Sequence, residues 1–214
     1  MKHQFTVFIG VAAFIGFTGC AWTSMTSFTD PSYRSTSFAR ILVVANVSNL
    51  QSRQRIESRL VQEFRDEGVF AMEGTNLFPP TRTLSDEQKV QLLRDNHIDS
   101  YIVIDVGETG TQQVYIPQTG SSTNTKGNVS VYGNTATYQE KSTTTTYGGY
   151  TVSKPWANFN AKLFDVATGQ TAWVASAFTG GNAYAGVNTV VNSFCGKTVE
   201  QLTKDGVIKK GIRE

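Results

Sequence analysis

The sequence predicts an α/β fold, a mixed sheet flanked by about three helices, in the order β-α-β-α-β, polar insertion, β-hairpin, α. Three patterns predict it. Two runs rich in β-branched residues, 39–47 and 100–106, are typical of strands buried on both faces. Amphipathic helical patterns alternate with those runs and close the chain. Two segments of alternating polarity flank a turn at Gly169, which predicts a hairpin.

The first strand and helix follow from the apolar pattern of residues 39–67. Residues 39–47 (ARILVVANV) form a nearly continuous apolar run. Residues 51–67 then repeat apolar side chains at helical spacing, with Arg and Glu on the opposite side. Gly68 ends this pattern, as glycine commonly does after a helix. The predicted apolar face consists of Ile56, Leu60, Val61 and Phe64.

A second strand, a second helix and a third strand complete the first half. Residues 69–72 predict a short strand. Ser85, with Gln88 three residues later, has the pattern of a capping box and predicts a helix from 86 to about 96. Residues 100–106 (SYIVIDV) predict a third buried strand.

The segment 110–153 differs in composition from the rest of the chain. It contains 11 threonines and three charged residues, Lys126, Glu140 and Lys141. Its 44 residues exceed the length of an ordinary loop in a compact domain. We therefore expect an extended polar hairpin or a mobile insertion, with partial strand structure or a function of its own.

The last third of the chain predicts a hairpin and a helix. Residues 156–165 and 170–178 alternate in polarity around Ala167-Thr168-Gly169, where Gly169 supplies the positive φ of a turn. A glycine-rich stretch, 179–186, leads to a helix from about 188 to 203. The charged tail that follows, residues 205–214, is expected to fray.

The first twenty residues predict the compartment. Lys2 precedes a short apolar stretch, too short for a comfortable permanent span, which is typical of a secretory signal. The stretch ends in Phe17-Thr18-Gly19-Cys20, which resembles a bacterial lipobox. This pattern predicts cleavage between Gly19 and Cys20 and acylation (palmitate among the acyl groups) of the Cys20 thiol; the alternative is an ordinary signal peptide with a chance cysteine. Three acyl chains would hold Cys20 on a bilayer permanently.

The predicted organisation follows from these segments. Ala21 after the cysteine resembles the sorting signal of an outer-membrane lipoprotein, which faces the periplasm. The Ser/Thr-rich stretch before the first strand is typical of a tether. The predicted parts are a lipoprotein signal peptide (1–19), a lipidated tether (20–38), an α/β domain (39–204) with the insertion, and a charged tail (205–214).

Composition excludes several classes of protein. A formal net charge of +2 is too even for an electrostatic nucleic-acid binder, so no nucleic-acid partner is expected. Two cysteines exclude a disulfide-dense scaffold. Cys195 lies in a helical pattern and is expected to be a small buried residue rather than a reactive thiol.

The sequence predicts no catalytic, cofactor or metal site. His97 is the single histidine after the signal peptide, and no zinc-ligand spacing surrounds it. Gly196-Lys197-Thr198 resembles the end of a phosphate loop, but it falls inside the last predicted helix. We interpret the remaining candidate carboxylates as charges at strand ends: Asp99, Asp105 and Glu108.

The predicted hairpin contains a motif formed by Leu163, Asp165, Thr168, Gly169, Gln170 and Trp173. Curli assembly/transport lipoproteins, penicillin-binding-protein activators and TolB amino-terminal domains carry a similar pattern, followed by a glycine-rich approach to a final helix. The resemblance covers about residues 39–109 and 154–204. It implies an α/β envelope domain, and its members include a secretion channel, a synthase activator and a translocation component.

Three functions follow as hypotheses. The first is a non-enzymatic lipoprotein, anchored through Cys20, that binds another envelope protein as an adaptor or assembly factor. The second is a subunit of an oligomeric secretion channel, with residues 110–153 supplying a membrane hairpin; a homo-oligomer is left open. The third is a cell-wall hydrolase that would have to use His97 and Asp105.

Overall fold

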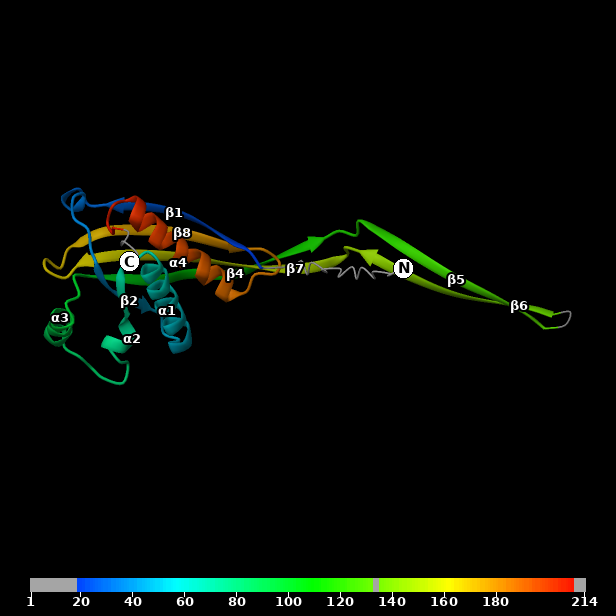
Figure 1. Cartoon of the computed structure of the whole chain (residues 1–214), viewed down its shortest axis with the longest axis horizontal. Helices are drawn as coiled ribbons and strands as arrows, with labels where there is room; N and C mark the ends of the chain where they lie inside the picture. The colour runs from blue at the N-terminus through cyan, green and yellow to red at the C-terminus, as the bar shows by residue number, and fades with distance from the viewer. Residues whose placement is uncertain (1–18, 133–134, 210–214) are drawn as a thin grey trace, which may run out of the picture.

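A six-stranded mixed sheet forms the body of the protein (Figure 1). The computed structural model describes residues 19–132 and 135–209. It describes the side chains of all these residues except 128–138. Residues 1–18 of the predicted signal peptide lie outside the described residues, as does the end of the charged tail. In spatial order the strands are β1 (Ala21–Thr29), β8 (Thr171–Gly181), β7 (Tyr150–Asp165), β4 (Ser100–Ile116), β2 (Arg40–Asn46) and β3 (Phe70–Glu73).

The strand directions confirm the predicted α/β class. β2 runs parallel to both β3 and β4, while β7 pairs antiparallel with β4 and β8. The helices cover the sheet as connections between its parallel strands and as the last element, as expected for this class. They are α1 (Leu50–Asp66), α2 (Gly74–Leu77), α3 (Asp86–Asp95) and α4 (Val187–Lys204), with a short 3₁₀ turn, η1, at Pro31–Tyr33.

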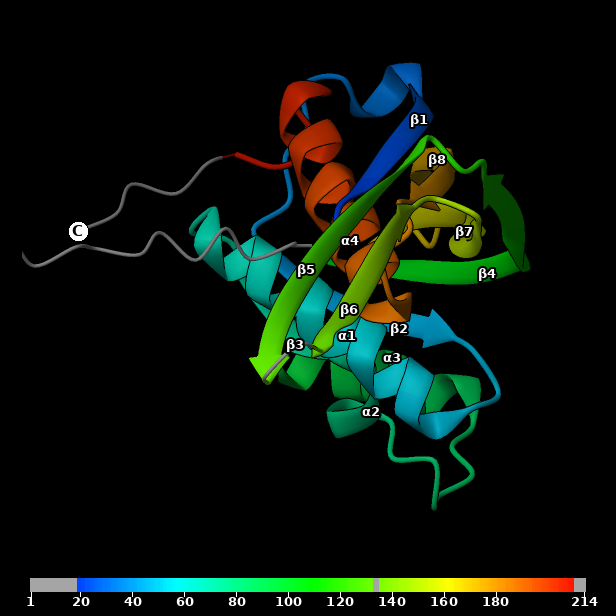
Figure 2. The same ribbon diagram turned by 90° about the vertical axis from the view of Figure 1, so that its right-hand side faces the viewer.

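The main core lies between the sheet and the pair α1 and α4. The predicted apolar face of α1 is buried there, and Phe159 of β7 stacks on Phe194 of α4 with ring centroids 4.1 Å apart. Figure 2 shows α1 and α4 together on one side of the sheet. Large side chains that are fully buried include Trp173, Phe64, Phe194, Ile41, Leu60, Ile102 and Leu163.

A smaller core lies on the opposite face. Leu42 of β2 packs there with Leu93 of α3 and Ile98. The predicted capping box at the start of α3 is present, because Ser85 and Gln88 each accept a hydrogen bond from the other's backbone N–H. α3 lies at the end of the domain away from β5 and β6, so it covers only part of this outer face (Figure 1).

A buried carboxylate joins β2, α1 and α2. Glu57 of α1 is 1% exposed. Its carboxylate accepts hydrogen bonds from the backbone N–H of Ala45 (3.0 Å) and from the backbone N–H and hydroxyl of Thr75 (2.8 and 2.6 Å). Every oxygen of this buried group therefore has a donor, as a buried charge requires.

The first strand corrects the predicted tether. Residues 21–29 pair with β8 along their whole length, so most of the stretch from 20 to 30 belongs to the sheet. The Ser/Thr-rich composition is typical of a tether, but the hydroxyls of β1 that face the helices form hydrogen bonds within the domain. Thr23 is hydrogen-bonded to Ser193 of α4 (2.8 Å), and Ser27 donates to Asp205 (2.6 Å).

The start of the charged tail is also part of the domain, against the prediction that it frays. Asp205 accepts hydrogen bonds from the Trp173 indole N–H (2.8 Å) and from Ser27. Val207 and Ile208 are buried, and the Val207 carbonyl accepts the Phe38 backbone N–H (2.9 Å). The prediction was wrong because it rested on the charged composition of residues 205–214, which indicates neither the burial of Val207 and Ile208 nor the hydrogen bonds of Asp205.

The polar insertion is a long two-stranded ribbon. β4 and β7 continue their pairing beyond the domain to Ile116 and Tyr150, and β5 (Gly120–Tyr132) and β6 (Thr135–Tyr147) then pair in a sheet of their own. Figure 1 shows the ribbon projecting away from the α/β body. Of the two predicted alternatives, the extended hairpin is the one observed.

Candidate functional site: the end of the sheet beside Cys20

The predicted cleavage residues lie where the ribbon leaves the domain. Gly19 is partly buried and Cys20 is exposed. The Cys20 carbonyl accepts the Asn182 backbone N–H at 2.8 Å, and Ala21 is already paired with Gly181. The backbone beside the predicted acylation site is therefore fixed to the sheet, with no linker between Cys20 and β1.

An aromatic cluster lies next to Cys20 on the outer face of the sheet. It consists of Trp22, Trp156 and Phe178, and we call it the aromatic patch. The Phe178 ring centroid is 5.4 Å from that of Trp22 and 6.1 Å from that of Trp156. Glycines make room for the indoles: a Cβ on Gly110 would lie 2.7 Å from the Trp156 ring, and one on Gly180 would lie 3.2 Å from Trp22 Nε1. The two tryptophan rings thus lie over glycine positions of the sheet, where no side chain stands in their way.

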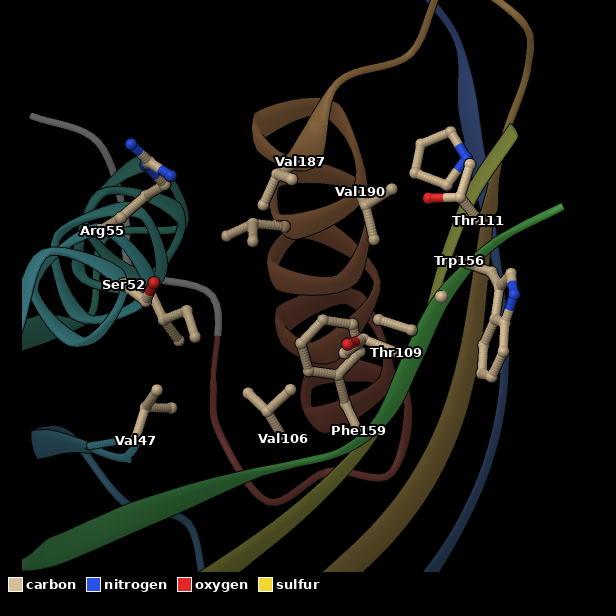
Figure 3. Close-up of a pocket in the computed structure, with 15 residues that line it drawn as sticks. Val47, Ser52, Arg55, Val106, Thr109, Thr111, Trp156, Phe159, Val187 and Val190 are labelled. Carbon is tan, nitrogen blue, oxygen red and sulfur yellow. The ribbon is translucent and has the colours of Figure 1, made fainter. Parts of the chain in front are cut away.

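An apolar hollow of about 360 Å³ lies on the helix side of the same end (Figure 3). α1 and α4 form one part of its wall, and the strands β4 and β7 form the other. Arg55 and Ser52 lie at the α1 side, and Trp156 points to the far side of the strands. None of its described lining residues is a carboxylate, histidine or cysteine, so the hollow suits an apolar group better than acid–base chemistry.

The two faces of the ribbon differ in charge. Lys126 and Lys141 are direct cross-strand partners, so both ammonium groups lie on one face. Glu140 lies opposite Gly127 and therefore on the other face. Side chains that share the lysine face include Ser122, Asn124, Thr143, Thr145 and Tyr147.

Hydroxyl pairs cross the other face of the ribbon. The hydroxyls of Thr123 and Thr144 are 3.0 Å apart, and Thr125 donates to Ser142 at 3.4 Å. These contacts join β5 to β6 but bury little apolar surface, since the described side chains of the ribbon are exposed. Over its described side chains, the ribbon is therefore polar on both faces.

The hairpin motif of the family resemblance has a structural role. The Asp165 carboxylate accepts hydrogen bonds from the Thr168 hydroxyl (2.8 Å), the Ala167 backbone N–H (2.9 Å) and the Tyr33 hydroxyl (3.1 Å). Gly169 has φ +71°, which the turn between β7 and β8 requires. The motif closes this turn, while Trp173 joins β8 to Asp205 behind it.

Two of the candidate carboxylates, Asp99 and Asp105, make contacts that serve the fold and lie apart from each other. Asp99 accepts the backbone N–H groups of Ala39 (2.8 Å) and Arg40 (3.1 Å) at one end of the sheet. Asp105 lies six residues further along β4, which corresponds to about 20 Å at ~3.3 Å per residue. Glycosidase carboxylates stand within roughly 5–10 Å, so these two acids do not form such a pair.

The phosphate-loop resemblance falls within α4, as predicted. Thr198 is buried and donates to the Phe194 carbonyl at 2.9 Å, and Lys197 pairs with Glu200 at 2.7 Å. Cys195 is buried beside them; burial raises the pKa of its thiol far above the ordinary value, and the Glu63 carboxylate adds to this. The thiol is therefore held protonated, as expected of a structural cysteine.

The described residues offer neither a metal site nor a membrane-spanning helix. No group of three or more His, Cys, Asp or Glu residues within 19–132 and 135–209 is placed to hold a metal ion. Of the helices in the described part of the chain, none combines the length and apolarity needed to cross a bilayer.

No protein-family model matches the sequence, and no curated protein matches it. Among solved structures, the PelC dodecamer of Paraburkholderia phytofirmans is similar at 11% identity over 87% of this chain and 99% of that one, with a TM-score of 0.49. Lipoprotein GNA1162 of Neisseria meningitidis is similar at 14% identity over 78% and 99%, with a TM-score of 0.40. With TM-scores below 0.5, these similarities assign no activity to this chain, and membership of the curli assembly group stays a prediction.

Proposed function

We propose that this protein is a non-enzymatic bacterial lipoprotein, anchored through acylated Cys20 to the periplasmic side of the outer membrane, which binds another envelope protein as an adaptor or assembly factor. The ribbon formed by β5 and β6 is the binding element in this proposal. The observation that carries it is a long two-stranded ribbon that projects from the domain beside Cys20 and pairs only with itself among the described elements.

The physics of such a ribbon favours a partner. An isolated two-stranded sheet is marginally stable in water, because it lacks a third strand or a layer that covers an apolar face. β5 and β6 each offer a free edge of backbone N–H and C=O groups, and such edges pair readily with another chain. A protein that added a strand or covered one face would supply what the ribbon lacks.

The charge on the lysine face indicates the chemistry of that partner. Like charges directly opposite each other destabilise a strand pair, by a few tenths to about 1 kcal/mol. Lys126 and Lys141 occupy such a position, and no carboxylate shares their face among the described side chains. An acidic surface on the partner would remove this repulsion, so we propose that it presents carboxylates to this face.

Two observations support the proposed anchor: the lipobox pattern that ends at Cys20, and the exposed position of Cys20 immediately before β1. The hollow lined by Val190 and Phe159 supports a binding role over catalysis, because its lining is apolar with Arg55 as its charged group. The cell-wall hydrolase would need His97 or another acid beside Asp105, but His97 and Asp99 precede the extended strand β4, in which Asp105 is the sixth residue, and this separation weighs against it.

The test places a photo-crosslinking residue at Thr143, on the lysine face, in the full-length protein in cells. A discrete cross-link to one other envelope protein is expected there. Thr144 is the matched control, because it is the next residue of the same strand and faces the other way. Replacing Lys126 and Lys141 with Glu should abolish the Thr143 product. An unchanged product in that double variant, or no product at Thr143, would contradict the proposal.

The anchor has its own test. Replacing Cys20 with Ala should move the protein from the membrane fraction to the soluble fraction. Persistence of the variant in the membrane fraction would show that acylation of Cys20 is not what holds the protein there.

A second candidate function is a subunit of an oligomeric secretion channel. β5 and β6 have 13 residues each, above the roughly 9–11 that a membrane-spanning strand needs. The polar character of the described side chains on both faces weighs against it, since a spanning strand needs one apolar face. The mass of the acylated protein in mild detergent separates the two: a ring of defined subunit number favours the channel, and a monomer excludes it.

A further inference from the structure

We propose that the aromatic patch, together with Lys154, is a second membrane contact that lies in the headgroup region of the bilayer and fixes the orientation of the domain. The inference rests on the proposed acylation of Cys20. Trp22, Trp156, Phe178 and Lys154 line the same depression in the surface as Cys20. The occupant is the lipid surface that holds the acyl chains.

The rigid connection at Cys20 brings the patch to the bilayer. The Cys20 carbonyl is held by Asn182, and Trp22 is the second residue after Cys20, within the paired strand β1. Acyl chains on the Cys20 sulfur and amine therefore enter the bilayer within a few ångströms of the sheet. A flexible tether would let the domain turn freely, but a strand that begins at Ala21 does not.

The exposure of the patch fits an interface between lipid and water. Trp22 is 58% exposed and Phe178 is 38% exposed, although their two rings contact each other at a tilt and Phe178 also stacks on Trp156. Tryptophan is enriched at the headgroup level of membranes, where its apolar ring and its N–H group are both satisfied. In water the same rings would leave an apolar cluster uncovered.

The polar residues around the patch match a headgroup layer. Lys154, Gln112 and Asn182 surround the three rings, and the described lining of this depression contains no carboxylate. A lysine near an anionic bilayer surface contributes about 1 kcal/mol of attraction. The ammonium group of Lys154 would therefore face lipid phosphates while the rings lie slightly deeper.

The contact is confined to one end of the outer face. Further along the same face the side chains are polar, with Ser24 and Thr26 on β1, Ser176 on β8 and Asn160 on β7. Phe28 is an exposed aromatic residue at the far end of β1 on this face, at 59% exposure. It lies six residues from Trp22, which corresponds to about 20 Å along the strand. The bilayer would thus contact only the Cys20 end of the outer face, and the ribbon, which continues beyond that end (Figure 1), would lie along the membrane surface rather than enter the bilayer.

The test measures quenching of tryptophan fluorescence by lipids that are brominated near the headgroup. The acylated full-length protein is placed in vesicles of phosphatidylethanolamine and phosphatidylglycerol, and flotation shows that it is bound. Trp156→Phe leaves Trp22 as the exposed reporter. Adding Trp22→Phe leaves buried Trp173, which serves as the background and as a check on folding. Phe28→Trp in that background is the matched control, because its exposure equals that of Trp22.

The expected result is strong quenching of Trp22 and none above background with the reporter at position 28. If the protein floats with the vesicles and Trp22 is not quenched, the membrane contact is wrong while the acyl anchor stands. Equal quenching at both positions would show that the contact is not confined to the Cys20 end of the outer face, and would overturn the proposed orientation. If the acylated protein does not float, the anchor and the inference fail together.

Discussion

Replacing Glu57 with Ala tests how the buried carboxylate holds the strands and helices together. In the native protein this carboxylate accepts three hydrogen bonds from Ala45 and Thr75. The variant leaves the two backbone N–H groups without this acceptor in a region where Glu57 itself is 1% exposed. The free energy of unfolding should therefore fall.

The magnitude follows from the number of donors that lose their acceptor. Each unsatisfied buried group costs about 1–3 kcal/mol, which gives roughly 2–6 kcal/mol for two N–H groups. Relief of the desolvation cost of the carboxylate offsets part of this. We expect a net loss of about 3 kcal/mol, and a domain of this size loses ~2–4 °C of Tm per kcal/mol, so Tm should fall by roughly 6–12 °C.

The assay is thermal unfolding followed by circular dichroism in mild detergent. Glu200→Ala is the matched control, because Glu200 is exposed and pairs with Lys197 on the surface of α4, where such a pair contributes about 0–1 kcal/mol. A fall in Tm for Glu57→Ala that is no larger than that for Glu200→Ala would refute the reasoning.

Three further variants or probes test other parts of the account. Gly169→Ala should cost about 1–2 kcal/mol of stability because its φ is +71°, whereas Gly120→Ala, which also meets open space but without a positive φ, should cost less; equal melting temperatures would contradict this. The Cys195 thiol should resist iodoacetamide near neutral pH, because its raised pKa keeps the thiolate fraction very small, and should react once urea unfolds the domain; mass spectrometry of the folded protein would expose an error. Asp205→Ala should lower stability by about 1–3 kcal/mol because the Trp173 indole N–H loses its acceptor, and an unchanged urea midpoint would count against that role.

Most of the α/β body could be predicted because its elements carry strong periodic signals. The apolar face at Ile56, Leu60 and Phe64 predicts α1, and the Ser85 capping box predicts the start of α3. The buried run SYIVIDV predicts the first part of β4. In each case local pattern and tertiary burial agree, so the sequence is sufficient.

The sheet edge at β1 and the residues after α4 could not be predicted in the same way. Their partners are distant in sequence: Thr23 contacts Ser193, and Asp205 accepts from Trp173 and Ser27. Composition alone gives such segments the character of linkers. The extended hairpin in 110–153 was one of two expected alternatives, and its regular pairing depends on cross-strand backbone contacts that composition does not encode.

The candidate site was predicted only in part. The lipobox pattern points to Cys20 from sequence alone, and the aromatic patch includes Trp22 and Trp156, which are separated by more than half of the chain. The register of β1, β8 and β7 brings them together, through the pairs of Gly180 with both residues. No local sequence motif predicts that Trp22 and Trp156 lie close together.

Removing the ribbon tests the central claim most directly. Ile116 and Tyr150 are direct cross-strand partners, so residues 117–149 can be replaced by Asn-Gly, the preferred two-residue hairpin turn. The acylated intact protein and this variant are then compared by native mass spectrometry in mild detergent. The account predicts that the intact protein carries a second, different envelope protein, and that the variant stays in the membrane fraction, melts as before and lacks that protein. A variant that keeps its bound partner would contradict the account.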